Sequence, residues 1–163
     1  MGSVSPMEFV LAVVDPEYPK EVNLKELETN KKLFKDAVKI AEKNGLYYYF
    51  VLRLKESNLD LPFLNKERWE KELQKLSMYK RTLEFLNDMR ENHGIEYILI
   101  KACTRVPHIP RDIDIFVRIG DKKKICYMFE LMGLKSIYSN DVETAFCKEG
   151  YLKLDVYSKI QYV

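Results

Sequence analysis

The sequence predicts an α+β protein in which N-terminal helices precede a small mixed β-sheet. Up to residue 92, apolar residues recur at the spacing of amphipathic helices. After Gly94 the pattern changes to the alternation of strands, which a single helical segment interrupts. We therefore expect residues 1–92 to form a helical region that packs on an α/β core made by residues 93–163, the two together forming one compact unit.

Three segments of the first region have helical character. Residues 23–44 form an amphipathic pattern, with Gly45 in the position that often ends a helix. Residues 46–56 are rich in aromatic and β-branched side chains, which leaves helix and strand both open, and we favour helix. Residues 64–89 predict a long helix that ends before Gly94.

The second region alternates between strands and one helix. Residues 95–100 predict a buried strand, and a loop with two prolines leads from there to a strand around Asp112. Asp121 is placed to begin a helix that ends at Gly133. Short segments of alternating character follow, separated by turns, and are expected to be antiparallel strands: 134–138, 142–147 and 151–157.

Bulk composition excludes several classes of protein. The chain has 163 residues, a formal net charge of +2 and 47% hydrophobic residues, and it contains no apolar run of membrane-spanning length. Three cysteines without CxxC spacing indicate neither a disulfide framework nor a cysteine zinc site. The start of the chain lacks the pattern of a secretory signal. We expect a cytoplasmic protein without a membrane partner.

The segment 111–117, Arg-Asp-Ile-Asp-Ile-Phe-Val, carries the most specific chemical signal. Successive side chains of a strand point to opposite faces, so Asp112 and Asp114 share one face while branched aliphatic residues occupy the other. Two carboxylates at this spacing lie roughly 6–7 Å apart, a separation that divalent cations can bridge. The segment therefore predicts a site for a divalent metal ion.

A third carboxylate belongs to a segment of the same kind near the end of the chain. In residues 151–157, Leu152, Leu154 and Val156 share one face, and Asp155 lies on the other. If this strand lies beside the Asp112 strand, the three acids converge, and their mutual repulsion calls for a cation. Ligation by oxygen alone favours a hard ion, Mg²⁺ or Mn²⁺.

From about Met78 onward the chain resembles the nucleotidyltransferase superfold, which includes polymerase-β-like, kanamycin-nucleotidyltransferase-like and uncharacterised nucleotidyltransferase-like families. Four stretches carry the resemblance. They are Ile98-Leu99-Ile100-Lys101-Ala102, Arg111-Asp112-Ile113-Asp114-Ile115, the helix from Asp121 to Gly133, and Leu154-Asp155-Val156. They cover less than half of the chain.

The resemblance implies transfer of a nucleoside monophosphate from an NTP to an acceptor by a two-metal mechanism. Asp112 and Asp114 would hold two Mg²⁺ ions on the triphosphate, and Asp155 would assist the second ion and activate the attacking hydroxyl. These enzymes usually have Gly-Gly or Gly-Ser after the first strand, where this chain has alanine, Cys103 and Thr104. The predicted phosphate-binding residues are Lys101, Cys103, Thr104, Arg105 and Arg111.

Two other functions remain open at this point. The departure from the glycine motif is also compatible with a module of the same fold that has lost catalysis. Carboxylates on neighbouring strands with a lysine nearby also suit a metal-dependent nuclease, which the near-neutral charge disfavours. We expect the acceptor to be a small molecule, a protein or an RNA end. The second lobe of the cleft is expected from the helices before Gly94, from a second copy of the chain or a partner chain, or from the rest of a longer protein of which this chain is a fragment.

Overall fold

The structure, a computed structural model, describes residues 4–19, 21–100 and 109–159. Contacts divide these residues into two compact units. The described residues up to Leu73, with Ile109, form the first unit, and those from Gln74 onward, without Ile109, form the second. The division therefore falls inside a helix, earlier than the boundary at residue 92 that the sequence pattern suggests, and domains at 1–92 and 93–163 stay a prediction.

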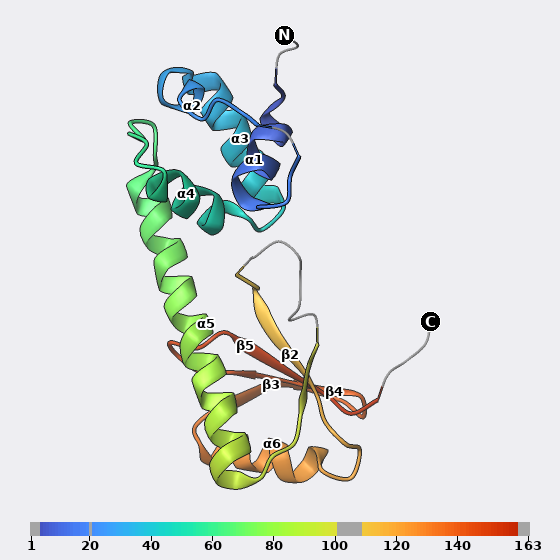
Figure 1. Cartoon of the computed structure of the whole chain (residues 1–163). Coiled ribbons are helices and arrows are strands. Elements are labelled where there is room, and N and C mark those ends of the chain that lie inside the picture. Colours follow the sequence, from blue (N-terminus) through green and yellow to red (C-terminus); the bar gives the residue numbers. More distant parts are fainter. Residues whose placement is uncertain (1–3, 20, 101–108, 160–163) are drawn as a thin grey trace. The chain divides into compact units, whose positions relative to one another are not determined.

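Helices make up the regular structure described in the first unit (Figure 1). A capping box begins the first of them, because the Ser5 hydroxyl accepts a hydrogen bond from the backbone of Glu8 while the Glu8 carboxylate accepts one from the backbone of Ser5. The helices are α1 (Pro6–Val14), α2 (Glu26–Thr29), α3 (Lys31–Lys43), α4 (Tyr47–Glu56) and the first part of α5 (Lys66–His93).

The continuous helix expected over residues 23–44 is wrong, because the chain breaks at Asn30 between α2 and α3. Asn30 has non-helical backbone angles, φ −99° and ψ 88°, and its side chain accepts a hydrogen bond from the backbone N–H of Leu33 at 3.0 Å. Asparagine competes for backbone hydrogen bonds in this way and thereby starts a new helix. At the other end of α3, Gly45 adopts the expected positive φ of 70°.

The first unit has a hydrophobic core of its own. The core residues come from α1 to α4, and partly buried residues of the loop before α5, together with Trp69, pack against them. The ring of Trp69 stacks on Tyr48 with centroids 5.4 Å apart and an interplanar angle of 3°. The segment 46–56, which the sequence left between helix and strand, is the helix α4, with five of its residues buried in this unit.

The second unit is built on a five-stranded mixed sheet with the order β1-β2-β5-β4-β3 (Figure 1). β2 pairs in parallel with β5, and the other neighbours are antiparallel. The predicted α+β class is therefore confirmed. The elements of this unit after α5 are β1 (Ile98–Ile100), β2 (Asp112–Phe116), α6 (Lys122–Leu131), β3 (Lys135–Ser139), β4 (Glu143–Cys147) and β5 (Lys153–Tyr157).

Both helices of the second unit pack on the aliphatic face of this sheet. Phe85, Leu86 and Met89 of α5 join Ile125 and Phe129 of α6 in one core with the branched side chains of β2 and β5. Ring contacts continue this core from α5 across α6 to β4. The opposite face of β2 and β5, which carries the carboxylates, is therefore left uncovered by the helices of this unit.

The strand expected over residues 95–100 is shorter and less buried than the sequence suggests. β1 begins at Ile98, whose exposed fraction is 67%, and Leu99 is also exposed. β1 lies at the edge of the sheet with β2 as its partner, so its outer side lacks the cover of a neighbouring strand. Ile95, before the strand, is the residue that enters the core.

The described helices include none that is both long enough and apolar enough to cross a bilayer. The longest of them, α5, has 28 residues, but charged side chains recur throughout its length.

Thr82 of α5 offers a test of the helix–sheet packing in the second unit. Its hydroxyl accepts a hydrogen bond from the backbone N–H of Leu152 at 2.9 Å and donates one to the carbonyl of Met78 at 2.8 Å, and the residue is buried. Thr82→Val keeps the shape but leaves the buried N–H without its acceptor, so we expect a loss of about 1–3 kcal/mol in the free energy of unfolding.

Urea denaturation followed by circular dichroism measures this loss. Thr82→Ser is the matched control, because it keeps the hydroxyl, and it should be the more stable of the two variants. A valine variant as stable as the wild type would contradict the role assigned to this hydrogen bond.

Candidate functional site

The parallel pairing of β2 with β5 brings the predicted carboxylates together on one face. Asp112 lies opposite Lys153 and Asp114 lies opposite Asp155, while Ile113 and Leu154 between them point into the core. Neighbouring strands are separated by about 4.8 Å, so side chains in register on one face are direct neighbours. The condition on which the three-acid hypothesis depends, adjacency of the two strands with their aliphatic faces in one core, is therefore met.

Asp155 is the most deeply buried of the three acids. Its exposed fraction is 2%, against 8% for Asp114, and Asp112 is only half-buried. Its Oδ1 is buried and accepts no hydrogen bond from the described residues. A buried carboxylate oxygen without a hydrogen-bond donor lowers the stability of the fold. This atom is therefore a candidate to bind an exogenous cation or hydrogen-bond donor.

Within the described part of the chain, Lys153 forms ion pairs with two of these acids. Its Nζ lies 2.7 Å from Oδ2 of Asp155 and 3.9 Å from Oδ2 of Asp112. The Lys153 side chain is 40% exposed, whereas that of Asp155 is 3% exposed, so the ion pair joins a partly exposed lysine to a buried carboxylate. One ammonium thus compensates part of the negative charge of this face.

The electrostatics of the site are dominated by burial. Burial raises the pKa of the Asp155 carboxyl, and the hydrogen bond from Lys153 opposes this increase only in part. The same hydrogen bond raises the pKa of Lys153, so its ammonium form is favoured. Burial and then the charge of Asp114 raise the pKa of Tyr157 to about 12, and its phenol stays protonated beside the acids.

The donor set of this face suits a hard divalent cation, but the side chains as they stand do not enclose one. Among the described residues, no group of three or more Asp, Glu, His or Cys side chains is close enough to hold a metal ion. The orphaned Oδ1 of Asp155 and the neighbouring Asp114 nevertheless provide carboxylate oxygens, the ligands that Mg²⁺ prefers. The chemistry of these oxygens fits a hard cation, although the described side chains do not by themselves form a metal site.

The predicted phosphate-binding residues are only partly visible. Lys101, Cys103, Thr104 and Arg105 lie outside the described residues. Arg111 is exposed and directly precedes β2.

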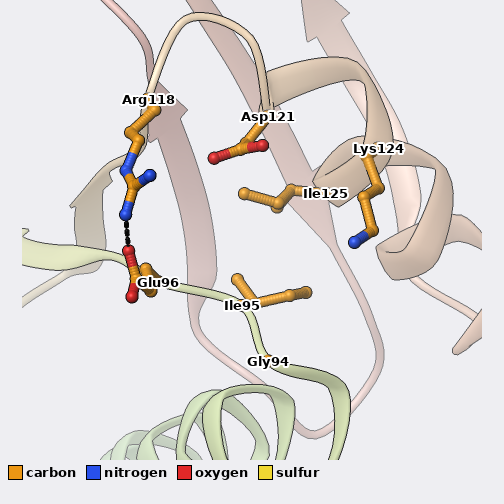
Figure 2. Close-up of a pocket in the computed structure, with 7 residues that line it drawn as sticks. All are labelled: Gly94, Ile95, Glu96, Arg118, Asp121, Lys124 and Ile125. Atoms are coloured by element: carbon orange, nitrogen blue, oxygen red, sulfur yellow. Dashed lines mark hydrogen bonds and ion pairs between the residues drawn. The ribbon is translucent and has the colours of Figure 1, made fainter.

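A separate pocket of about 220 Å³ lies within the second unit, between the segment that joins α5 to β1, the turn that precedes α6 and the first turn of α6. Figure 2 shows the Arg118 guanidinium reaching the carboxylate of Glu96, with which it forms an ion pair, and shows Asp121 and Lys124 across the pocket. The two pairs of opposite charge leave no net charge in its lining. None of the predicted site residues lines it, so this pocket is separate from the candidate site at β2 and β5.

The ion pair of Lys153 was not predicted from the sequence. Strand alternation placed Lys153 on the face of Asp155, but only the structure shows that its ammonium contacts both strands. Glu143 was also missed: it lies opposite Tyr157 on β4 and adds a fourth carboxylate to this face. The signal for Lys153 was a lysine two residues before a buried acid, which places both on one side of a strand.

No protein-family model matches the chain, and no curated protein matches it. Among solved structures, the chain is similar to the lincosamide antibiotic adenylyltransferase LnuA in its lincomycin-bound form. The match has 22% sequence identity and a TM-score of 0.41, and covers 50% of this chain and 56% of that chain. Similarity of this extent assigns neither activity nor substrate to the present chain.

The ion pair between Lys153 and Asp155 predicts a large effect of Lys153→Met on stability. The substitution keeps the length of the aliphatic stem but leaves a buried carboxylate without its counter-charge. We expect a loss of about 2 kcal/mol in the free energy of unfolding, less than for a fully buried pair because Lys153 is partly exposed.

Chemical denaturation at neutral pH measures this loss. Lys135→Met, at an exposed position of β3, is the control and should change stability little. Adding Asp155→Asn to Lys153→Met should recover part of the loss, because the buried charge is then removed as well. Equal stability of Lys153→Met and the wild type would refute the pairing.

Proposed function

We propose that this chain is a Mg²⁺-dependent nucleotidyltransferase that transfers a nucleoside monophosphate from an NTP to an acceptor hydroxyl. The acceptor oxygen bonds to the α-phosphorus, the bond from that phosphorus to the bridging oxygen breaks, and pyrophosphate leaves. The proton of the acceptor hydroxyl passes to Asp155. A divalent ion bound at such a site would supply electrostatic stabilisation of the charge that develops on the phosphate oxygens.

The observation that carries this proposal is the register of β2 with β5. It sets Asp114 directly beside Asp155, whose Oδ1 is buried without a hydrogen-bond donor among the described residues. Both strands resemble the acidic strands of the nucleotidyltransferase superfold, Asp112-Ile113-Asp114 in β2 and Asp155 in β5. This resemblance supports a metal-binding and catalytic role for the adjacent acids. In an acid with a purely structural role, we would expect both buried carboxylate oxygens to accept hydrogen bonds, because an unpaired buried oxygen is destabilising.

The carboxylates available are sufficient for a phosphate-bound metal. Mg²⁺ in phosphoryl-transfer sites is usually held by one or two carboxylates together with waters and substrate phosphate oxygens. Asp112, Asp114 and Asp155 would hold the ion, and Arg111 would contact the triphosphate. A second copy or a partner chain would complete the acceptor side of the cleft.

One observation favours a second candidate, a metal-free binding module of the same architecture. Lys153 already pairs with both Asp155 and Asp112 and thereby compensates charge that a metal ion would otherwise neutralise. In that case the face would bind a neutral or cationic ligand, and catalysis would be absent. Metal binding separates the two candidates.

Substitution of the β2 acids tests the catalytic proposal. Asp112→Asn or Asp114→Asn should lower Mg²⁺-dependent NTP consumption about a hundredfold or more, because each removes a carboxylate that holds the ion. The assay supplies α-labelled NTPs with small-molecule, protein and RNA acceptors in turn, and follows label transfer and pyrophosphate.

Asp141→Asn is the control, because Asp141 is exposed and lies between β3 and β4. It should retain full activity, and thermal unfolding should show that all three variants are folded. Turnover that persists in both β2 variants would end the proposal. Shortened nucleic acid in place of a labelled acceptor would indicate a nuclease.

The competition between Lys153 and a metal ion gives a further expected outcome. Lys153→Met should bind Mn²⁺, measured by electron paramagnetic resonance with an NTP present, several-fold more tightly than the wild type, because a nearby positive charge is removed. Lys135→Met should bind Mn²⁺ as the wild type does. Absence of Mn²⁺ binding in every form would favour the metal-free module.

A further inference from the structure

The first unit contains a pocket of about 440 Å³ that the proposed transferase chemistry does not use. Residues of α3, the start of α4, the loop before α5 and the start of α5 line it, all within the first unit. Pockets of about 300–1,000 Å³ are typical of small-molecule sites. Its size therefore fits a small organic ligand.

Aromatic rings, together with Val38 and Leu64, form the apolar part of this lining. Phe34 of α3 and Tyr47 of α4 are buried, and Phe63 of the loop is partly buried. The rings of Phe34 and Phe63 pack at 6.2 Å between centroids, inclined by 56°. Such a lining favours a ligand with a flat or hydrocarbon body.

The polar part of the lining is mainly cationic. Lys35 and Lys39 lie one helical turn apart on α3, both exposed, and neither forms an ion pair within the described residues. Arg68 is the third cation of the lining, and it pairs with two acids: Nε lies 3.7 Å from Oε1 of Glu42, which also lines the pocket, and a terminal guanidinium nitrogen lies 3.3 Å from Oε1 of Glu72. Two like charges at this helical spacing are mildly unfavourable, so an anion between them would stabilise the helix.

Tyr47 and Arg68 contact each other at this pocket. Burial and then the charge of Glu42 raise the pKa of Tyr47 to about 12, so its phenol is neutral at physiological pH. Arg68 stands over the Tyr47 ring, with its Cζ 5.5 Å from the ring centroid, and this contact holds the guanidinium at the pocket.

We propose that this pocket binds a small organic anion, with its aromatic or hydrocarbon body on the rings of Phe34 and Phe63 and its acidic group between Lys35 and Lys39. The proposal is independent of the nucleotidyltransferase activity, because neither a metal ion nor a nucleotide takes part.

Fluorescence titration with 8-anilinonaphthalene-1-sulfonate, a fused aromatic body with one sulfonate, tests the proposal on the full chain. The double variant Lys35→Gln/Lys39→Gln should bind the probe about five- to tenfold more weakly at low salt, since two solvent-accessible charges are removed. The neutral analogue N-phenyl-1-naphthylamine should bind both forms within about twofold, because it lacks the group that the lysines contact.

Matched controls separate this site from nonspecific binding. Lys32→Gln/Lys43→Gln removes the same charge from exposed positions of α3 outside the pocket lining and should leave sulfonate binding unchanged. Val38→Trp fills the pocket and should abolish binding of both probes, with circular dichroism showing that the helices are intact. Equal losses in the two lysine pairs, or full binding by Val38→Trp, would overturn the proposal.

Discussion

The parallel pairing of β2 with β5 is the constraint on which the candidate site depends. It joins two strands that lie about forty residues apart in the chain, and its register sets Asp114 beside Asp155 and Asp112 beside Lys153. The aliphatic residues between these positions face the core under α5 and α6. Because side chains alternate across a strand, burying that face obliges the charged residues to share the other.

Burial of Asp155 costs folding free energy, and it also sets the chemical character of the site. Removing a carboxylate from water is unfavourable unless a counter-charge or a hydrogen-bond donor replaces the lost solvation. Lys153 does this for Oδ2, while Oδ1 is left without a donor among the described residues. The carboxylate is therefore held by Lys153 through one oxygen, while the other oxygen is buried and accepts no hydrogen bond from the described residues.

The structure shows which parts of the fold local patterns could predict. The end of α3 at Gly45 and the alternation of β2 and β5 follow from side-chain spacing and backbone freedom within a few residues. The break at Asn30 was missed because helical periodicity continues across it, whereas the capping hydrogen bond depends on the backbone angles of one residue. β1 was expected to be buried because apolar composition does not distinguish an edge strand from a central one.

From the sequence alone, the side of each strand on which Asp112, Asp114 and Asp155 project was determined, because alternation depends only on neighbouring residues. Tertiary structure alone decided that β5 lies beside β2, that Lys153 joins the two acidic strands, and that Lys35 and Lys39 border an aromatic pocket. These features depend on contacts between residues distant in the chain. Such contacts are selected by burial of the whole core, which no local spacing records.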